Sequence, residues 1–166
     1  MDLETLRWTL SIQLRYTTHV FQANLAGLSD DDALRQPEPG GNCVNWVTGH
    51  VVGTRGALLG LLGQTIPFPA ERYERYRRGS APLTGAAGAM PLSTMMADFA
   101  ATAEPLRAGL ASLTKAALAA KAPFSPGGRE DETVGSLLVG LVFHEASHTG
   151  QLGTLRRLTG AAGALG

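Results

Sequence analysis

The sequence predicts an all-α fold, a four-helix bundle with a long crossover between its second and third helices. Three observations favour this class. Four segments space their apolar residues with the period of a helix, no segment alternates as a half-buried strand would, and residues 64–90 are rich in proline and glycine. Four long helices with one long connection are typical of bundles whose facing helices hold metal ions in the core.

The first predicted helix runs from about Asp2 to Leu28. On a wheel drawn at about 100° per residue, its large apolar residues share one side: Leu3, Leu6, Leu10, Leu14, Phe21, Leu25 and Leu28. Ser29 is then suited to be the N-cap of a short helical turn, because three aspartates follow it at the positive end of that turn.

The second predicted helix begins near Asn42, a favourable N-cap, and ends near Gly63. It contains four glycines, and each costs about 1 kcal/mol of helix propensity relative to alanine. We therefore expect packing to hold this helix, with the glycines permitting close backbone approach. The crossover at 64–90 follows, with a short helix at about Ala70–Arg78. A connection of this length is usually functional or mobile.

The third predicted helix begins at Pro91 or Ser93 and ends near Lys121. Pro105 lies inside it and should kink it, because proline removes a helical hydrogen bond. The fourth predicted helix begins near Asp131–Thr133 and ends near Thr159.

The whole chain, residues 1–166, is predicted to be a single domain. Basic and acidic residues number 14 each, which argues against binding to nucleic acid or to an anionic membrane. The lone cysteine, Cys43, allows no intramolecular disulfide and is expected to be a small core residue. The N-terminus lacks the basic region of a signal peptide. We therefore expect a soluble cytoplasmic protein.

Two histidines of the fourth helix, His144 and His148, are four residues apart, so their side chains lie one above the other on the same face. Leu137, Leu141 and Leu155 lie within about 60° of them on the wheel. The pair therefore interrupts an apolar stripe and points into the core, where an unpaired polar group is costly. This arrangement favours a shared metal ion.

His50 has the same character in the second helix, because Trp46, Val47 and Ala57 lie on its side of the wheel. Three inward histidines on two helices are typical of an open metal site, in which water or substrate takes the remaining positions. His19 lies with Trp8 and Ile12 on the side opposite the leucine stripe. We therefore exclude His19 as a ligand and expect this surface to contribute to a subunit contact.

The segment His144-Glu145-Ala146-Ser147-His148 also matches the His-Glu-x-x-His motif of zinc proteases, in which Glu145 would be the general base. No Asp, Glu or His follows His148, so the downstream third ligand of such enzymes is missing. The metzincin extension also fails, because Gln151 and Thr154 replace its Gly and His. Gln151 and Glu145 remain candidates for residues that surround the ligands, although Gln151 could instead satisfy a backbone group.

Two segments resemble the DinB-like (YfiT-like) superfamily of metal-dependent enzymes: Asn45–Gly53 resembles its second helix, and His144–Leu152 resembles its last. The resemblance covers the whole chain in helix order and loop lengths, but only these two segments are specific. It implies a four-helix bundle whose metal ion is held by His50, His144 and His148. Ser147 departs from the family pattern, in which tyrosine is frequent at this position.

The resemblance also implies functions. Characterised relatives include S-transferases that use bacillithiol or mycothiol, and many relatives form homodimers. We therefore expect a divalent metal ion, zinc or nickel first and iron or manganese next, since imidazole suits several metals. The expected activity is transfer of a low-molecular-weight thiol to a small electrophile, or hydrolysis. The alternative is a non-catalytic metal-binding stress or interaction protein. Four arginines of the crossover could attract an anionic substrate or could form a solvated face: Arg72, Arg75, Arg77 and Arg78.

Overall fold

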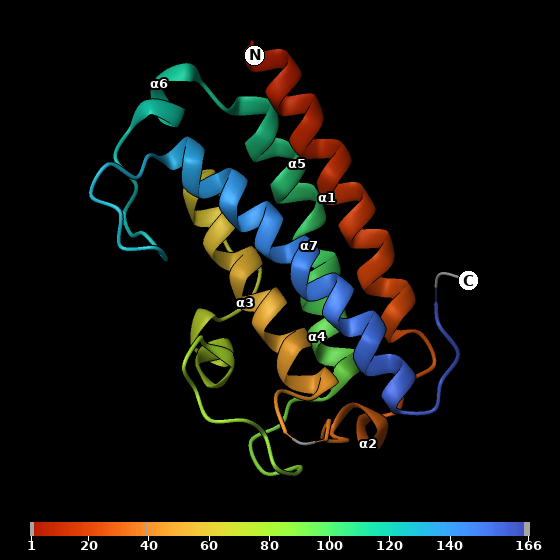
Figure 1. Cartoon of the computed structure of the whole chain (residues 1–166). Coiled ribbons are helices and arrows are strands. Elements are labelled where there is room, and N and C mark those ends of the chain that lie inside the picture. The colour runs from red at the N-terminus through yellow and green to blue at the C-terminus, as the bar shows by residue number, and fades with distance from the viewer. Residues whose placement is uncertain (1, 39, 165–166) are drawn as a thin grey trace.

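A computed structural model describes residues 2–38 and 40–164 and shows an all-α fold (Figure 1). Within these ranges the only β-structure is an isolated bridge between Lys121 and Thr133. The helices are α1 (Leu3–Leu25), α2 (Asp30–Ala33), α3 (Val44–Leu61), the 3₁₀ helix η1 (Ala70–Tyr76), α4 (Leu92–Ala101), α5 (Ala103–Ser112), α6 (Lys115–Ala119) and α7 (Val134–Leu158). The prediction of an all-α fold is confirmed.

The long helices run alongside one another, with the α4–α5 pair in the place of the third predicted helix (Figure 1). Helix α7 packs against α1 and α3, and α5 packs against the same two helices. None of the helices in the described ranges has the length and hydropathy needed to cross a membrane.

Helix α1 buries the predicted stripe, because Leu10, Leu14, Phe21 and Leu25 are all buried. It ends at Leu25, three residues before the predicted end, and Gly27 follows with a φ of +74°, a left-handed conformation that glycine adopts readily. Ser29 caps α2 as predicted. Its hydroxyl accepts from the Asp32 amide while the Asp32 carboxylate accepts from the Ser29 amide.

Helix α3 begins one residue later than predicted, because its N-cap is Cys43 and not Asn42. Cys43 provides no side-chain hydrogen bond to the helix and is fully buried, as expected for a small core residue. Burial therefore decides the start of this helix, and capping chemistry does not.

The prediction of one continuous third helix is wrong, because the helix is interrupted at Thr102 and again after Ser112. The Thr102 hydroxyl donates to the Phe99 carbonyl at 2.6 Å, three residues back, which competes with the helical ladder. Pro105 lacks the amide that would bond to Ala101, so the predicted kink appears as this interruption one turn earlier. After Ser112 the buried Leu113 leaves the helix, and the Thr114 side chain caps α6.

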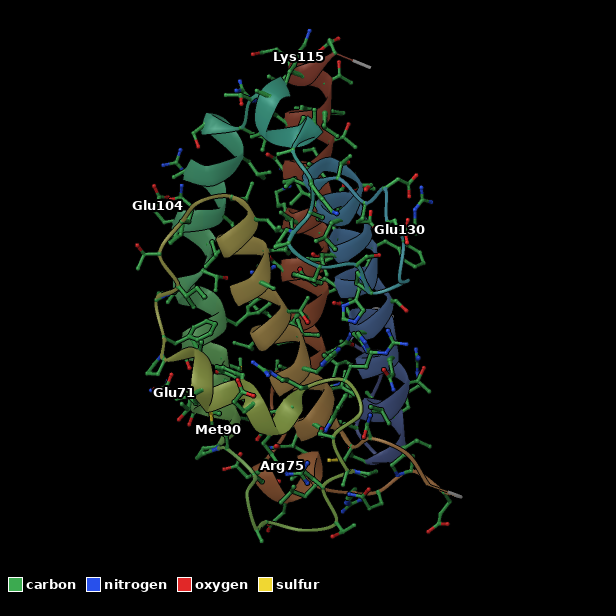
Figure 2. The ribbon with its side chains drawn as sticks, turned by 90° about the vertical axis from the view of Figure 1, so that its left-hand side faces the viewer. Glu71, Arg75, Met90, Glu104, Lys115 and Glu130 are labelled. Atoms are coloured by element: carbon green, nitrogen blue, oxygen red, sulfur yellow. The ribbon has the colours of Figure 1, made fainter. Side chains whose placement is uncertain are left out.

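Helix α7 begins after Thr133, which forms a capping box with Ser136, and is followed by Gly160 in a left-handed conformation. The crossover packs across α3 and carries η1, which ends at Tyr76, two residues before the predicted end (Figure 2, with Glu71, Arg75 and Met90 labelled). The crossover thus brings residues distant in sequence next to His50.

Candidate metal centre

Three imidazoles meet between α3 and α7. The Nε2 atom of His144 lies 3.1 Å from Nε2 of His50 and 3.1 Å from Nε2 of His148. One ring nitrogen from each of the three residues lies within 4.8 Å of the others. Two nitrogens bound to one metal ion at about 2.0–2.1 Å are roughly 3.0–3.4 Å apart. The three side chains could therefore hold a metal ion with small adjustments.

The second ring nitrogen of two histidines is committed to a fixed acceptor. Nδ1–H of His50 donates to the Tyr76 carbonyl at 2.7 Å, and Nδ1–H of His148 donates to Oε1 of Gln151 at 2.8 Å. These bonds leave the Nε2 lone pairs free to face the common centre, the arrangement typical of metal-binding histidines. Nδ1 of His144 is buried and has no hydrogen-bond partner among the described residues.

The surroundings keep two of the imidazoles neutral. The pKa of His144 is lowered to about 4, mainly by burial and also by the nearby His148, His50 and Arg78. Burial also lowers the pKa of His50, although the Tyr76 carbonyl opposes that shift. Neutral imidazole is the form that binds metal ions, so at neutral pH both rings are available as ligands.

The contact between α3 and η1 places Tyr76 beside His50. A Cβ added at Gly49 would lie 2.4 Å from the Tyr76 ring, so only glycine allows this approach. The Tyr76 hydroxyl donates to Oδ1 of Asn45 and accepts from the Met90 amide, which fixes the ring. Sequence reasoning missed Tyr76, because its carbonyl acts on His50 and a carbonyl has no sequence signature.

A cavity of about 680 Å³ opens beside the histidines, with His50 and His144 in its wall. Its lining is mostly apolar and includes Ile66, Phe68 and Phe124. Arg77 and Arg78 also line it. A cavity of this size and character suits a small organic ligand. The arrangement can therefore present a metal-bound group to such a molecule.

Comparison with known proteins adds the family. The sequence model of the DinB superfamily matches residues 13–152, a range that contains His50, His144 and His148. The chain belongs to the DinB superfamily. A search of curated protein sequences finds no match to it. The resemblance seen in the two histidine segments is thus confirmed at the level of the family.

In this DinB-superfamily chain, Glu145 does not join the histidines as one of the residues around the ligands. Its carboxylate accepts from Nε and Nη2 of Arg55, both at 2.8 Å, and from the Thr17 hydroxyl at 2.6 Å. As the residue next to His144, it points about 100° away around the helix and faces α1 and α3. The general base of a zinc protease must reach the metal centre, so the structure speaks against that alternative.

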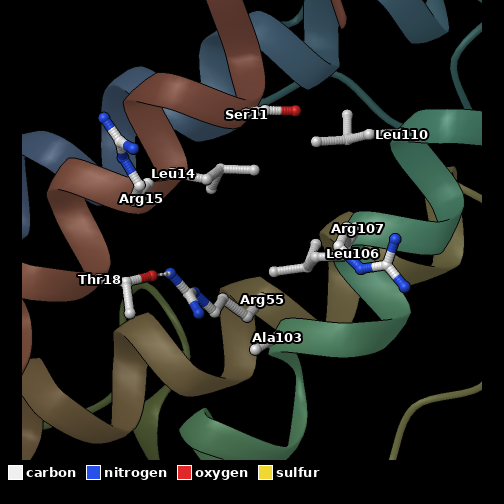
Figure 3. Close-up of a pocket in the computed structure, with 9 residues that line it drawn as sticks. All are labelled: Ser11, Leu14, Arg15, Thr18, Arg55, Ala103, Leu106, Arg107 and Leu110. Carbon is white, nitrogen blue, oxygen red and sulfur yellow. Dashed lines mark hydrogen bonds between the residues drawn. The ribbon is translucent and has the colours of Figure 1, made fainter. Parts of the chain in front are cut away.

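The partner of Glu145 was also missed by sequence reasoning, because Arg55 lies 90 residues away and carries no motif. Arg55 donates to the Thr18 hydroxyl, and its guanidinium lies over the Phe99 ring, 3.6 Å from the centroid. It borders a second, smaller cavity of about 340 Å³, in which Leu14, Leu106 and Leu110 face one another between α1 and α5 (Figure 3).

His19 is exposed on α1, consistent with its exclusion as a ligand. Trp8 is 66% exposed on the same helix, and the contact between two copies that we expected there stays a prediction.

Proposed function

We propose that the protein binds one divalent metal ion through Nε2 of His50, His144 and His148 and acts as an enzyme on small electrophiles. The convergence of the three Nε2 atoms, with two Nδ1 atoms committed to Tyr76 and Gln151, carries this proposal. Zinc or nickel is the expected ion, with iron or manganese next. Such an ion, when bound, makes a coordinated thiol or water available as a nucleophile near neutral pH.

The nucleophile is proposed to come from solution. Cys43, the cysteine of the chain, is fully buried at the N-cap of α3 and is not among the residues that line the cavity. Transfer of a low-molecular-weight thiol is therefore our first candidate and hydrolysis the second. The open cavity beside His50 and His144 supports an enzyme over a non-catalytic metal-binding protein, which has no need of a substrate-sized space.

The metal site is tested by elemental analysis of protein purified without an affinity tag. The parent protein should contain about one metal ion per chain, while His50→Ala, His144→Ala and His148→Ala should each lose most of it, because two histidines hold an ion far less tightly than three. His19→Ala, a change in an exposed histidine, should leave the content unchanged. Unchanged metal content in the three ligand variants would refute the site.

The activity is tested with the metal-loaded protein and a panel of cellular thiols offered to test electrophiles. Conjugation should depend on the metal ion and disappear with a chelator. Hydrolysis of activated esters and amides is measured in parallel. Failure of every thiol and every hydrolytic substrate would reject the catalytic part of the proposal and leave a metal-binding protein.

We expect Gln151 to affect metal affinity by orienting the His148 ring. Gln151→Leu removes the acceptor that orients the His148 ring, so the affinity for Zn²⁺ should fall by about 10–100-fold. A competition titration against a chromophoric chelator measures this loss. Gln22→Leu, a change in an exposed glutamine of α1, should have little effect. Parent-like affinity in Gln151→Leu would show that the hydrogen bond does not support the ligand.

A further inference from the structure

The four arginines of the crossover differ in what they contact. Arg72 forms an ion pair with Asp98, at 2.6 Å between Nη1 and Oδ2, and Arg77 pairs with Glu74. Arg75 donates to the carbonyls of Ala81 and Pro82, away from the cavity.

Of these four arginines, Arg78 alone has both of the following properties. It lines the cavity beside the histidines, and within the described residues it forms no ion pair. The one hydrogen bond of its side chain to the described residues runs from Nη1 to the Pro126 carbonyl at 3.2 Å. That bond ties the crossover to the loop before α7 and leaves most of its five N–H donors free. Arg78 is thus an available cation, held at the edge of the cavity.

The charged side chains in the cavity wall are all positive. The basic lining residues are Arg77, Arg78 and the histidines His50 and His144, and among the described residues no carboxylate lines the cavity. Since Glu74 offsets the charge of Arg77, Arg78 supplies the uncompensated positive charge. Apolar walls strengthen the field of such a charge toward a small anion. The apolar lining suits the uncharged part of the same molecule.

We propose that Arg78 binds a carboxylate on the molecule that reaches the metal centre, so that this protein selects small acidic ligands with an apolar body. Guanidinium pairs with carboxylate through two parallel hydrogen bonds, which neutral and cationic ligands cannot form. This inference rests on the proposed metal site and adds the substrate class. It assigns Arg78 as a specificity-determining residue in the wall of the cavity that His50 and His144 also line.

The test uses full-length protein loaded with Co²⁺, whose absorption spectrum reports thiolate coordination. Two matched pairs of thiols serve as probes: 3-mercaptopropionate with 3-mercaptopropanol, and 6-mercaptohexanoate with 6-mercaptohexanol. Within each pair the thiol is similar and only the distal group differs. The parent protein should bind at least one acid about tenfold or more tightly than its alcohol, the effect expected of a charged hydrogen bond.

Arg78→Gln should reduce that preference to about twofold or less while leaving the alcohol affinity nearly unchanged, because only the anchor for the anion is lost. Arg78→Lys keeps the charge without the planar geometry and should retain part of the preference. Arg75→Gln, the matched control outside the cavity, should behave like the parent. Circular dichroism checks that each variant is folded.

The outcomes separate the two proposals. If acids and alcohols bind equally well in the parent, or if Arg78→Gln keeps the preference, the role of Arg78 is overturned while the metal site stands. If no thiol changes the Co²⁺ spectrum, thiol binding at the metal fails and this inference fails with it. If Co²⁺ does not bind at all, the metal site itself is overturned.

Discussion

Replacing Glu145 by glutamine is expected to lower the free energy of unfolding of the metal-free protein by about 3–5 kcal/mol. Glutamine keeps the size of the side chain but removes the charge that balances Arg55. Both side chains of this pair are only 1% exposed, so water cannot replace the lost partner. The Arg55 guanidinium would remain buried against the Phe99 ring and the threonine hydroxyls, which are weaker partners than a carboxylate.

Urea unfolding followed by far-ultraviolet circular dichroism, with a chelator present, measures this effect. Glu104→Gln is the matched control, because Glu104 pairs with Arg107 on the surface, where the two side chains are 71% and 73% exposed. Its loss should stay below about 1 kcal/mol. The double variant Arg55→Met/Glu145→Gln should recover part of the loss, since it leaves no buried unpaired charge. Equal small losses in Glu145→Gln and Glu104→Gln would contradict the buried pair.

The contact of Gly49 with Tyr76 should produce the second large effect. Gly49→Ala places a Cβ 2.4 Å from the Tyr76 ring. The ring cannot withdraw without weakening its bonds to Asn45 and Met90. We expect a loss of about 1–3 kcal/mol in the free energy of unfolding, after alanine's better helix propensity has returned up to about 1 kcal/mol. The Tyr76 carbonyl should shift with the ring, so the Zn²⁺ affinity at His50 should fall by roughly tenfold or more.

Gly140→Ala is the control for this prediction. Gly140 lies inside α7, where an added Cβ meets nothing within 4 Å, so the change should stabilise the protein by up to about 1 kcal/mol. Urea unfolding and chelator competition measure the two effects side by side. If Gly49→Ala were as stable as the parent and bound Zn²⁺ equally well, the close packing of η1 on α3 would not position His50.

The sequence predicted most of what depends on neighbours along the chain. Apolar periodicity is a local property, and it located α1, α3 and α7 to within a few residues. Ser29, predicted as an N-cap, caps α2, and Thr133, which lies at the predicted start of the fourth helix, caps α7. In the third helix the kink predicted at Pro105 became a break at Thr102, whose buried hydroxyl donates to the Phe99 carbonyl and also accepts from Arg55 of α3, a distant partner.

For the candidate metal site, too, some features follow from the local sequence and others only from the tertiary structure. Spacing alone predicted that His144 and His148 lie on one face of a helix. The helical wheel predicted that His50 faces the core, because an α-helix repeats every 3.6 residues in any surroundings. Only the tertiary structure decided that the three Nε2 atoms meet, because His50 and His144 are 94 residues apart. The tertiary structure also decided that the Tyr76 carbonyl accepts from His50 and that Glu145 forms an ion pair with Arg55. Those partners depend on how α3, η1 and α7 pack, and packing depends on side-chain volume across the whole core, which periodicity does not record.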